Sequence, residues 1–502
     1  MGIAQQALLV NQAAISVVSN NIANVSTEGY SKQTVDLTPS VNYSPMSNSV
    51  LAQALSGTGV DLNSIQRASD SYLQSYYRQQ NSANSYLDQY SEVAKSVENT
   101  TNELTGAKLE SAFTSFYTAA QNLSSNPTDA SARQSFIQSA QTIALKFNDM
   151  STTLSNLRTS LVGDATVSGS LDDSKISLQV GEVNDKLKQL ADVNDNILKT
   201  GSANSLLDKR DTIINDLSKL IPVNVTENPS GTVDLSINDV NILQGTKLLG
   251  TLSVATGTTS DPAKIQIKTD KGTLLADNIN SSINSGSIGA LLTAGGSDSS
   301  TLTIKGVLDN LDKLANNFST MVNNVQTVAD ADGTPAAIDK TTKTLIATTA
   351  ADVIFQSADG TAITAGNIKV NQTVLDDPYL IAAAKITPPI NTTNNDQIGN
   401  NDNMTALLNT RTNATTPMDT TPENYVSTMV GNIGTQVEGI KTRLTNQTAV
   451  LTTVKTQLSS ETGVSTDQEL ADLMKYQSAY QAAARVFTTC NTLLDTLVNL
   501  GK

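Results

Sequence analysis

The sequence predicts an α+β protein that is mainly α, built in nested layers with both termini together. Apolar residues recur at coiled-coil spacing near each end of the chain, and long helical patterns fill much of the interior. Two interior stretches change to the two-residue period of strands, with turn signals between the strands. The expected architecture therefore has terminal coiled-coil helices, a long-helix bundle and a β-rich inserted outer domain.

The segment Thr466–Lys502 has the pattern of one continuous helix. Its apolar or small residues alternate three and four positions apart, which is the spacing of a coiled-coil contact line. These residues, called the C-terminal seam, are Leu473, Tyr476, Tyr480, Ala483, Phe487, Cys490, Leu494 and Leu497. Thr466 with Glu469, or Ser465 with Gln468, forms a capping box at the start of the helix. A seam of this length predicts a partner helix, because a lone helix leaves it in water.

The first residues of the chain keep the same alternation. This N-terminal seam consists of Ala4, Leu8, Asn11, Ile15, Val18, Ile22 and Val25. A helix-stop and turn signal follows at Thr27-Glu28-Gly29. The polar Asn11 is of the kind that sets register in a coiled coil. Paired seams predict that the chain leaves its end domain, builds everything else and returns. The alternative is that the two helices dock separately on a globular core.

Composition narrows the classes of function. The 502 residues carry a net charge of −15, which argues against a nucleic-acid partner and against adhesion to an anionic membrane. No apolar run approaches the roughly 20 residues of a membrane helix, and no basic residue precedes Lys32, so a cleavable secretory signal is not expected. The chain has no histidine, which excludes histidine-based triads and metal sites. Its single cysteine, Cys490, cannot form an internal disulfide and is interpreted as a small core side chain.

Changes in hydrophobic period divide the chain into segments. The helical period ends at Pro222, and Pro422 starts the last long helix before the C-terminal one. The expected order is an N-terminal part of the inner coiled-coil domain with an extended arm (1–58), a helical bundle (59–221), a segment rich in β-hairpins (222–300), a helix that returns to the bundle (301–328), an outer insertion rich in strands and loops (329–421), a long bundle helix (422–460) and the C-terminal helix of the inner domain (461–502). The β-rich material is expected farthest from the termini.

Several acidic motifs are similar to parts of metal or catalytic sites. Asp330-Ala331-Asp332-Gly333 is similar to part of a calcium loop, but Val328 stands where an oxygen ligand is needed, so a surface turn is favoured. Asp208 and Asp211 lie one helical turn apart and are expected to form salt bridges on an exposed face rather than an acid–base pair. Paired carboxylates elsewhere lack an aromatic sugar cleft, since the chain has no Trp. The sequence therefore predicts no enzyme, no metal and no cofactor.

Two motifs at opposite ends resemble the bacterial flagellar axial proteins. The first is Ser19-Asn20-Asn21-Ile22-Ala23-Asn24 with Gly29-Tyr30-Ser31-Lys32-Gln33, and the second centres on Tyr480-Gln481-Ala482-Ala483-Ala484-Arg485-Val486. Ile65-Gln66-Arg67, Asn126-Pro127 and Leu206-Leu207-Asp208-Lys209-Arg210-Asp211 are similar to the hook-associated family of the hook–filament junction. The chain departs from the family in a shorter first helix and in Lys32, where Arg is common.

The resemblance implies a structural subunit of the flagellum. Its expected partners are further copies of itself in a ring, the hook protein, the next hook-associated protein on the filament side and a cytoplasmic export chaperone on the C-terminal helix. It implies secretion by the flagellar type III apparatus to the extracellular flagellum, with termini that are largely disordered until assembly orders them as coiled coils. The junction is expected to adapt the bending hook to the stiffer filament.

The expected assembly positions are seam residues. They are Leu8, Ile15, Val18, Ile22 and Val25 together with the whole C-terminal seam. Ile15, Val18, Ile22 and Val25 are expected to pack against Tyr480, Phe487, Leu494 and Leu497, within and between subunits. Three alternatives stay open: another flagellar axial protein such as a hook or second junction component, an extracellular coiled-coil adhesin, and a flagellar peptidoglycan hydrolase.

Overall fold

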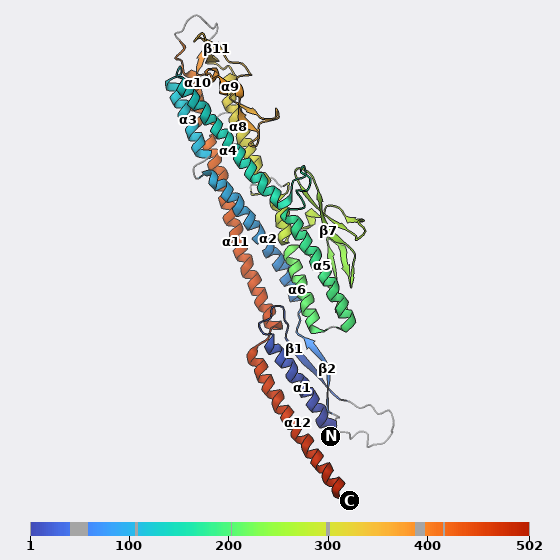
Figure 1. Cartoon of the computed structure of the whole chain (residues 1–502). Coiled ribbons are helices and arrows are strands. Elements are labelled where there is room, and N and C mark those ends of the chain that lie inside the picture. Colours follow the sequence, from blue (N-terminus) through green and yellow to red (C-terminus); the bar gives the residue numbers. More distant parts are fainter. Residues whose placement is uncertain are drawn as a thin grey trace.

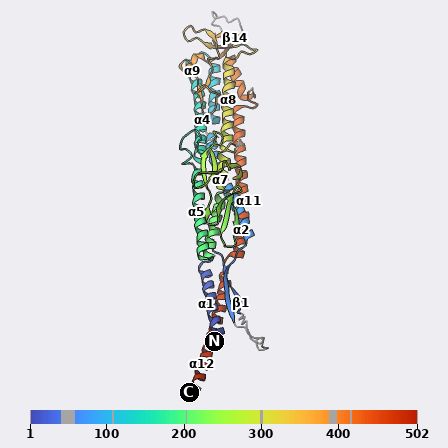
Figure 2. The same ribbon diagram turned by 90° about the vertical axis from the view of Figure 1, so that its right-hand side faces the viewer.

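Long helices give the molecule the shape of a rod with both termini at one end (Figure 1; Figure 2). The computed structural model describes residues 2–40, 59–105, 109–201, 203–297, 302–386, 397–414 and 417–500. The described helices are α1 (Gly2–Ala23), α2 (Ser71–Thr105), α3 (Leu109–Ser125), α4 (Ala130–Val162), α5 (Lys175–Thr200), α6 (Asn204–Leu220), α7 (Gly286–Gly295), α8 (Ile304–Thr327), α9 (Gln372–Asp376), α10 (Asp402–Thr412), α11 (Pro422–Thr462) and α12 (Thr466–Leu500).

Two of these helices, α2 and α11, pack along each other and form the spine of the rod (Figure 1). The start of α11 shows why the sequence begins a helix there. Pro422 occupies the first turn, where its missing N–H is not needed, and the side chain of Thr421 accepts a hydrogen bond from the backbone N–H of Asn424. The helix ends at Thr462 and is capped by Gly463, the first of three residues that lead into α12.

The described strands form small antiparallel sheets. They are β1 (Gln33–Pro39) with β2 (Val60–Arg67); β3 (Asn224–Glu227), β4 (Val233–Ile237), β5 (Val240–Gln244) and β6 (Lys247–Leu248) in that order; β7 (Thr251–Thr256), β8 (Ala263–Lys268) and β9 (Leu274–Ala276) in that order; β10 (Thr334–Ile338) between β11 (Leu345–Ala347) and β14 (Ala384–Ile386); and β12 (Phe355–Ser357) with β13 (Ile368–Val370). The ribbon of β1 and β2, called the arm, lies beside α1.

The bundle has two main apolar cores. The core nearer the termini joins α5, α6 and α7 to β4, β5 and β8. The second core joins α3, α4, α8 and α10 and is rich in phenylalanine. Phe318 lies at its centre, with ring centroids 4.9 Å from Phe113, 5.5 Å from Phe116 and 5.6 Å from Phe355. Long helices such as α4 contribute to both cores, which makes the bundle one continuous rod.

The β-rich material lies in two separate places. Strands β10 to β14 lie at the end opposite the termini, whereas β3 to β9 lie beside α5, midway along the rod (Figure 1). The expectation that all β-rich segments lie farthest from the termini is therefore wrong for β3 to β9. Side chains of α5 explain the difference: Asn184 bonds both backbone groups of Leu252, and Asn194 donates to the carbonyl of Val233. These amides, with the apolar faces of both sheets, attach the insertion along α5.

Candidate assembly interface and its joint to the bundle

The terminal helices α1 and α12 run antiparallel and pack on each other (Figure 1). On the N-terminal seam, Ala4 and Val18 are buried, Leu8, Asn11, Ile15 and Ile22 are half-buried, and Val25 is exposed beyond the end of α1. On the C-terminal seam, Leu473, Tyr476, Ala483, Phe487 and Cys490 are half-buried, whereas Tyr480, Leu494 and Leu497 are exposed. The single chain thus covers only part of either seam.

One hydrogen bond fixes the register of the two helices. The side-chain amide of Asn21 donates to Oε2 of Glu469 at 2.9 Å. Because both helices rise equally per residue, Ala4 then lies opposite about Val486. The last turns of α12 extend past the start of α1 (Figure 1).

This register overturns part of the expected packing. Leu494 and Leu497 have no residue of α1 beside them in the same chain and are 45% and 67% exposed. Val25 lies at the opposite end of the helix pair, so it does not meet them within one chain. Their packing between subunits remains a prediction.

A second face of α1 contacts the arm. Val10, Ala14, Val17 and Asn21 are buried on this face, and Gln6 bonds Asp61 of β2. The sequence analysis missed this stripe because it lies about a third of a turn from the N-terminal seam, which was taken as the single contact line. α1 is therefore held between α12 and the arm.

A polar cluster around the buried side chains of Asn21 and Glu469, called the pin, joins α1, the arm and α12. Its residues are Asn21, Tyr30, Lys32, Gln33 and Glu469. Asn21 exchanges two hydrogen bonds with the backbone of Gln33, at 2.8 and 3.0 Å, and accepts one from the Tyr30 hydroxyl at 2.8 Å. Lys32 pairs with Glu469 at 2.9 Å, and the Glu469 side chain is only 1% exposed.

Electrostatics and backbone shape keep the pin in place. Burial, with the nearby carboxylates Asp208 and Glu469, raises the pKa of Tyr30 to about 12, so its hydroxyl remains a donor at neutral pH. Gly29 has φ +81°, and a Cβ there would lie 2.4 Å from Oγ1 of Thr212 on α6. Glycine therefore lets the turn after α1 approach the bundle closely.

These contacts give physical roles to several signature residues. Asn21, Gly29 and Tyr30 shape the pin and the turn beside it. Asn20 donates to the Tyr30 hydroxyl at 3.2 Å, and Asn24 donates back to the carbonyl of Asn20. Ile22 is half-buried, whereas Ala23, Gln481 and Ala482 are exposed.

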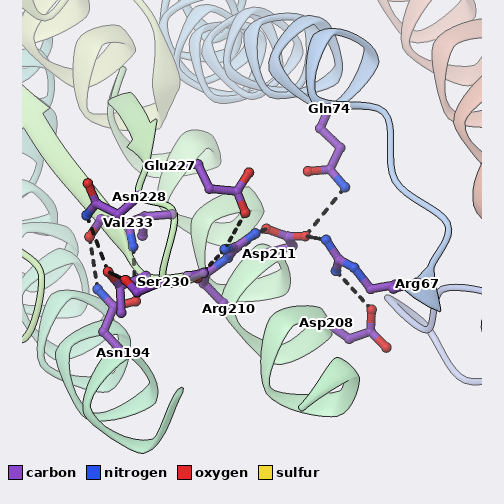
Figure 3. A network of polar contacts seen from close by, with 12 residues as sticks. Arg67, Gln74, Asn194, Asp208, Arg210, Asp211, Glu227, Asn228, Ser230 and Val233 are labelled. Carbon is purple, nitrogen blue, oxygen red and sulfur yellow. Dashed lines mark hydrogen bonds and ion pairs between the residues drawn. The ribbon is translucent and has the colours of Figure 1, made fainter. Parts of the chain in front are cut away.

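A second polar cluster, called the latch, joins the arm to the bundle (Figure 3). Its residues are Arg67, Arg78, Asp208, Arg210 and Asp211. Arg67, at the end of β2, reaches Asp208 at 3.0 Å and Asp211 at 2.7 Å on α6. Arg78 of α2 and Arg210 also contact Asp211, at 3.2 and 3.0 Å. Asp208 and Asp211 are 7% and 6% exposed, so the expected salt bridges exist, but the expected exposed face is wrong. Arginines from other elements bury these carboxylates, which local spacing could not indicate.

The latch continues into the β-rich insertion (Figure 3). Arg210 reaches Glu227 at 2.7 Å and donates to the carbonyl of Gly231 in the turn between β3 and β4. That turn is tied to α5 through the bond from Asn194 to Val233. One polar network therefore connects the arm, α6 and the midway insertion.

Other acidic motifs form local structure. Asp330 pairs with Lys385 and closes a turn with Gly333, in place of a calcium loop. Across the part of the chain that the structure describes, no group of three His, Cys, Asp or Glu side chains is placed to hold a metal ion. Within the same residues, no helix has the length and apolar character needed to cross a membrane.

Comparisons with known proteins agree with the signatures. The family model described as "Flagellar hook-associated protein FlgK helical domain" matches residues 94–337. Models described as "Flagella basal body rod protein" and "Flagellar basal body rod FlgEFG protein C-terminal" match residues 1–30 and 457–500. The terminal matches contain α1 and α12, and the central match runs from within α2 to β10, through bundle helices and the strands β3 to β9.

Curated relatives extend the likeness to the whole chain. Flagellar hook-associated protein 1 of Bacillus subtilis is 28% identical, covering 99% of this chain and 97% of the relative. The protein of that name in Salmonella typhimurium is 27% identical, covering 99% of each chain. In fold, the chain is similar to the flagellar hook junction protein FlgK of Burkholderia pseudomallei, with a TM-score of 0.58 at 16% identity, covering 78% of this chain and all of that one. Over 99% of its length this chain is therefore similar to curated proteins named flagellar hook-associated protein 1, and this likeness supports a structural role in the bacterial flagellum.

Proposed function

We propose that this chain forms the junction between flagellar hook and filament and assembles through its terminal helices. The observation that supports assembly most directly is the end of α12 that extends past α1. Leu493, Leu494, Leu497 and Val498 there are 45–67% exposed, although they continue the helix that packs on α1. A contiguous apolar surface of this kind is typical of a protein–protein contact.

A second copy of the chain is the partner that we propose for this surface. It carries the same seams, so α1 and α12 of neighbouring copies can continue the packing that a single chain leaves incomplete. The hook protein and the next hook-associated protein are proposed as neighbours on either side. We also propose that an export chaperone covers the C-terminal seam before type III export, and that the chain has no enzymatic activity.

The decisive variant is Leu494→Asp in the full chain. A buried, unpaired carboxylate at a contact between copies costs several kcal/mol. The matched control is Thr496→Asp, which places the same charge on the opposite face of α12. Both changes are at exposed positions, so each is expected to alter the stability of the single chain by less than about 0.5 kcal/mol.

The readout is assembly in cells that lack the native gene. Leu494→Asp is expected to leave hooks without filaments and to release flagellin into the medium, whereas Thr496→Asp restores filaments. The variant subunit must itself be found in the medium, which separates failed assembly from failed export. Normal filaments with secreted Leu494→Asp would contradict assembly through this seam.

The gene deletion tests the place of the subunit. Hooks without filaments support the junction. Absent hooks would move the chain to the rod or hook, and normal filaments would contradict a flagellar role and favour the adhesin.

Limited proteolysis tests ordering on assembly. In the free chain both termini are expected to be cut first, leaving a core of roughly 60–455, because half-covered seams let them open more often than the bundle, although the closed arrangement stays populated. Termini as resistant as the bundle would contradict that proposal.

A further inference from the structure

Apolar packing does not set the direction of α1 and α12, called the terminal pair, relative to the bundle. α1 packs on α12 and on the arm, and none of these elements packs extensively on a bundle helix within the described residues. Neither main core includes a residue of α1, α12 or the arm. The chain passes between these elements and the bundle twice, through the short segments from β2 to α2 and from α11 to α12, which are called the joint. Something other than a shared core must hold the two parts in line.

Open space lies beside the joint. A groove of about 460 Å³ is lined by the turn Glu28–Ser31 and by residues of α2, α6 and α11. Tyr77, Asn215 and Lys455 line its bundle side. Away from the close approach of Gly29 to Thr212, this space leaves room for the terminal pair to tilt toward the bundle unless other contacts prevent it.

The contacts that cross the joint are polar. The backbone N–H of Lys32 donates to the carbonyl of Thr462 at 2.7 Å, and Ser31 bonds Asp208. The strongest connection is the pair of contacts from Arg67 to Asp208 and Asp211, because all three side chains are at most 10% exposed. A planar guanidinium with two anchors fixes orientation as well as distance.

The charge arrangement makes the latch difficult to open partway. Asp211 contacts the guanidinium groups of Arg67, Arg78 and Arg210. Moving Arg67 away would leave the carboxylate of Asp208 without this cation and would remove one of the three guanidinium groups beside Asp211. Both carboxylates are buried, so the loss of neutralising charge is costly. The latch therefore favours one arrangement of arm and bundle over a continuous range.

We infer that the latch is the positioning device that sets the direction of the arm and terminal pair relative to the bundle. The latch acts within the single chain, so its effect on direction does not depend on assembly. In the proposed junction, a fixed direction would place every subunit's seam at the same angle to its neighbours.

The test measures arm direction by double electron–electron resonance between spin labels. The labels are attached at Thr38→Cys on the exposed end of β1 and Leu198→Cys on exposed α5, with Cys490→Ser removing the native thiol. The parent chain is expected to give one narrow distance distribution. Arg67→Gln is expected to broaden it at least twofold, and Arg67→Lys, which keeps the charge without the fork, to an intermediate width.

Two further variants separate direction from stability. Lys385→Gln removes a buried cation paired with Asp330 at the far end of the rod and is expected to keep the narrow distribution. Arg67→Gln with Asp208→Asn removes the uncovered charge, so thermal stability should recover while the distribution stays broad. A narrow distribution in Arg67→Gln with a folded bundle would overturn the inference. If Arg67→Gln unfolds the bundle, an unchanged distribution in Arg67→Lys would overturn it.

Discussion

The bundle core and α12 bury opposite kinds of side chain. In the bundle, Phe113, Phe116 and Phe318 are completely buried. In the described part of α12, Glu469 is the single buried side chain, and the apolar seam beside it is half-buried or exposed. Apolar burial therefore holds the bundle together within one chain, whereas the terminal pair has a fixed register but a seam that one chain leaves partly uncovered. A fixed register with a partly uncovered apolar seam is what we expect of helices that pack on another copy of the chain.

The largest expected effect tests this contrast with two identical substitutions. Phe318→Ala should destabilise the bundle by about 3–5 kcal/mol, because a fully buried ring with three aromatic neighbours leaves a cavity. Phe487→Ala, on the half-buried C-terminal seam, should leave the main unfolding transition unchanged within about 0.5 kcal/mol. Urea unfolding followed by circular dichroism measures both. Equal losses would show that one cooperative core includes the terminal pair.

A smaller effect is expected from Glu469→Gln in the pin. The change removes the ion pair with Lys32 and weakens the bond from Asn21, at a cost of about 1–3 kcal/mol. Hydrogen exchange should become faster in α1 and α12 while the bundle keeps its protection. The control is Glu438→Gln on α11, whose exposed pair with Lys441 is expected to contribute little. Faster exchange throughout the bundle would contradict a local role for the pin.

Sequence patterns predicted the long helices well because their signals are local. The terminal alternation and Pro422 lie within the elements they predict, as α1, α12 and α11 show. α10 was not predicted, because its short segment lies in a stretch dominated by turn-forming residues. Local sequence patterns could not predict the placement of β3 to β9. It depends on side-chain amides of α5, which these patterns do not distinguish from other polar residues of a helix.

The joint could be predicted only in part. The signatures drew attention to Asn21, Gly29 and Tyr30, but spacing did not say what they contact. Asn21 and Glu469 are 448 positions apart, and Arg67 and Asp208 are 141 apart. Glu469 was interpreted as a capping residue, yet its carboxylate reaches α1 and the arm. Long-range polar pairs leave no periodic trace, so a single sequence does not reveal them.

Gly29→Ala should have a further, smaller effect. An alanine at φ +81° costs about 1–2 kcal/mol, and its Cβ would displace the Thr212 side chain. Thermal melting of the bundle should change little, because the strain can be relieved by moving the turn away from α6. Gly169→Ala is the matched control: φ is +82°, but nothing lies within 4 Å of the added Cβ. Faster exchange in the arm of Gly29→Ala, beyond that in Gly169→Ala, would measure the close approach itself.

The smallest effect expected is a pH dependence that divides the two carboxylates of the latch. Burial opposes ionisation of Asp211, but Arg210, Arg67 and Arg78 outweigh it and lower its pKa. Its contribution to stability is therefore complete above the ordinary value of 3.8 and lost as pH falls through the lower folded-state pKa. At Asp208 burial wins over Arg67 and raises the pKa, so ionisation at neutral pH carries a penalty that protonation relieves.

The two asparagine variants should consequently respond to acid differently. The stability lost in Asp211→Asn should be greatest near neutral pH and shrink as pH falls below 3.8, where the parent carboxylate also becomes neutral. Asp208→Asn should reduce stability less than Asp211→Asn at neutral pH. The difference in free energy of unfolding between Asp208→Asn and the parent should change at pH values above 3.8, because the folded-state pKa of Asp208 is raised above that value. Urea unfolding of the three proteins from pH 3 to 7 measures this. Parallel pH profiles would mean that the arginines do not distinguish the carboxylates, and the latch would then be a diffuse charge cluster rather than a pair of anchors centred on Asp211.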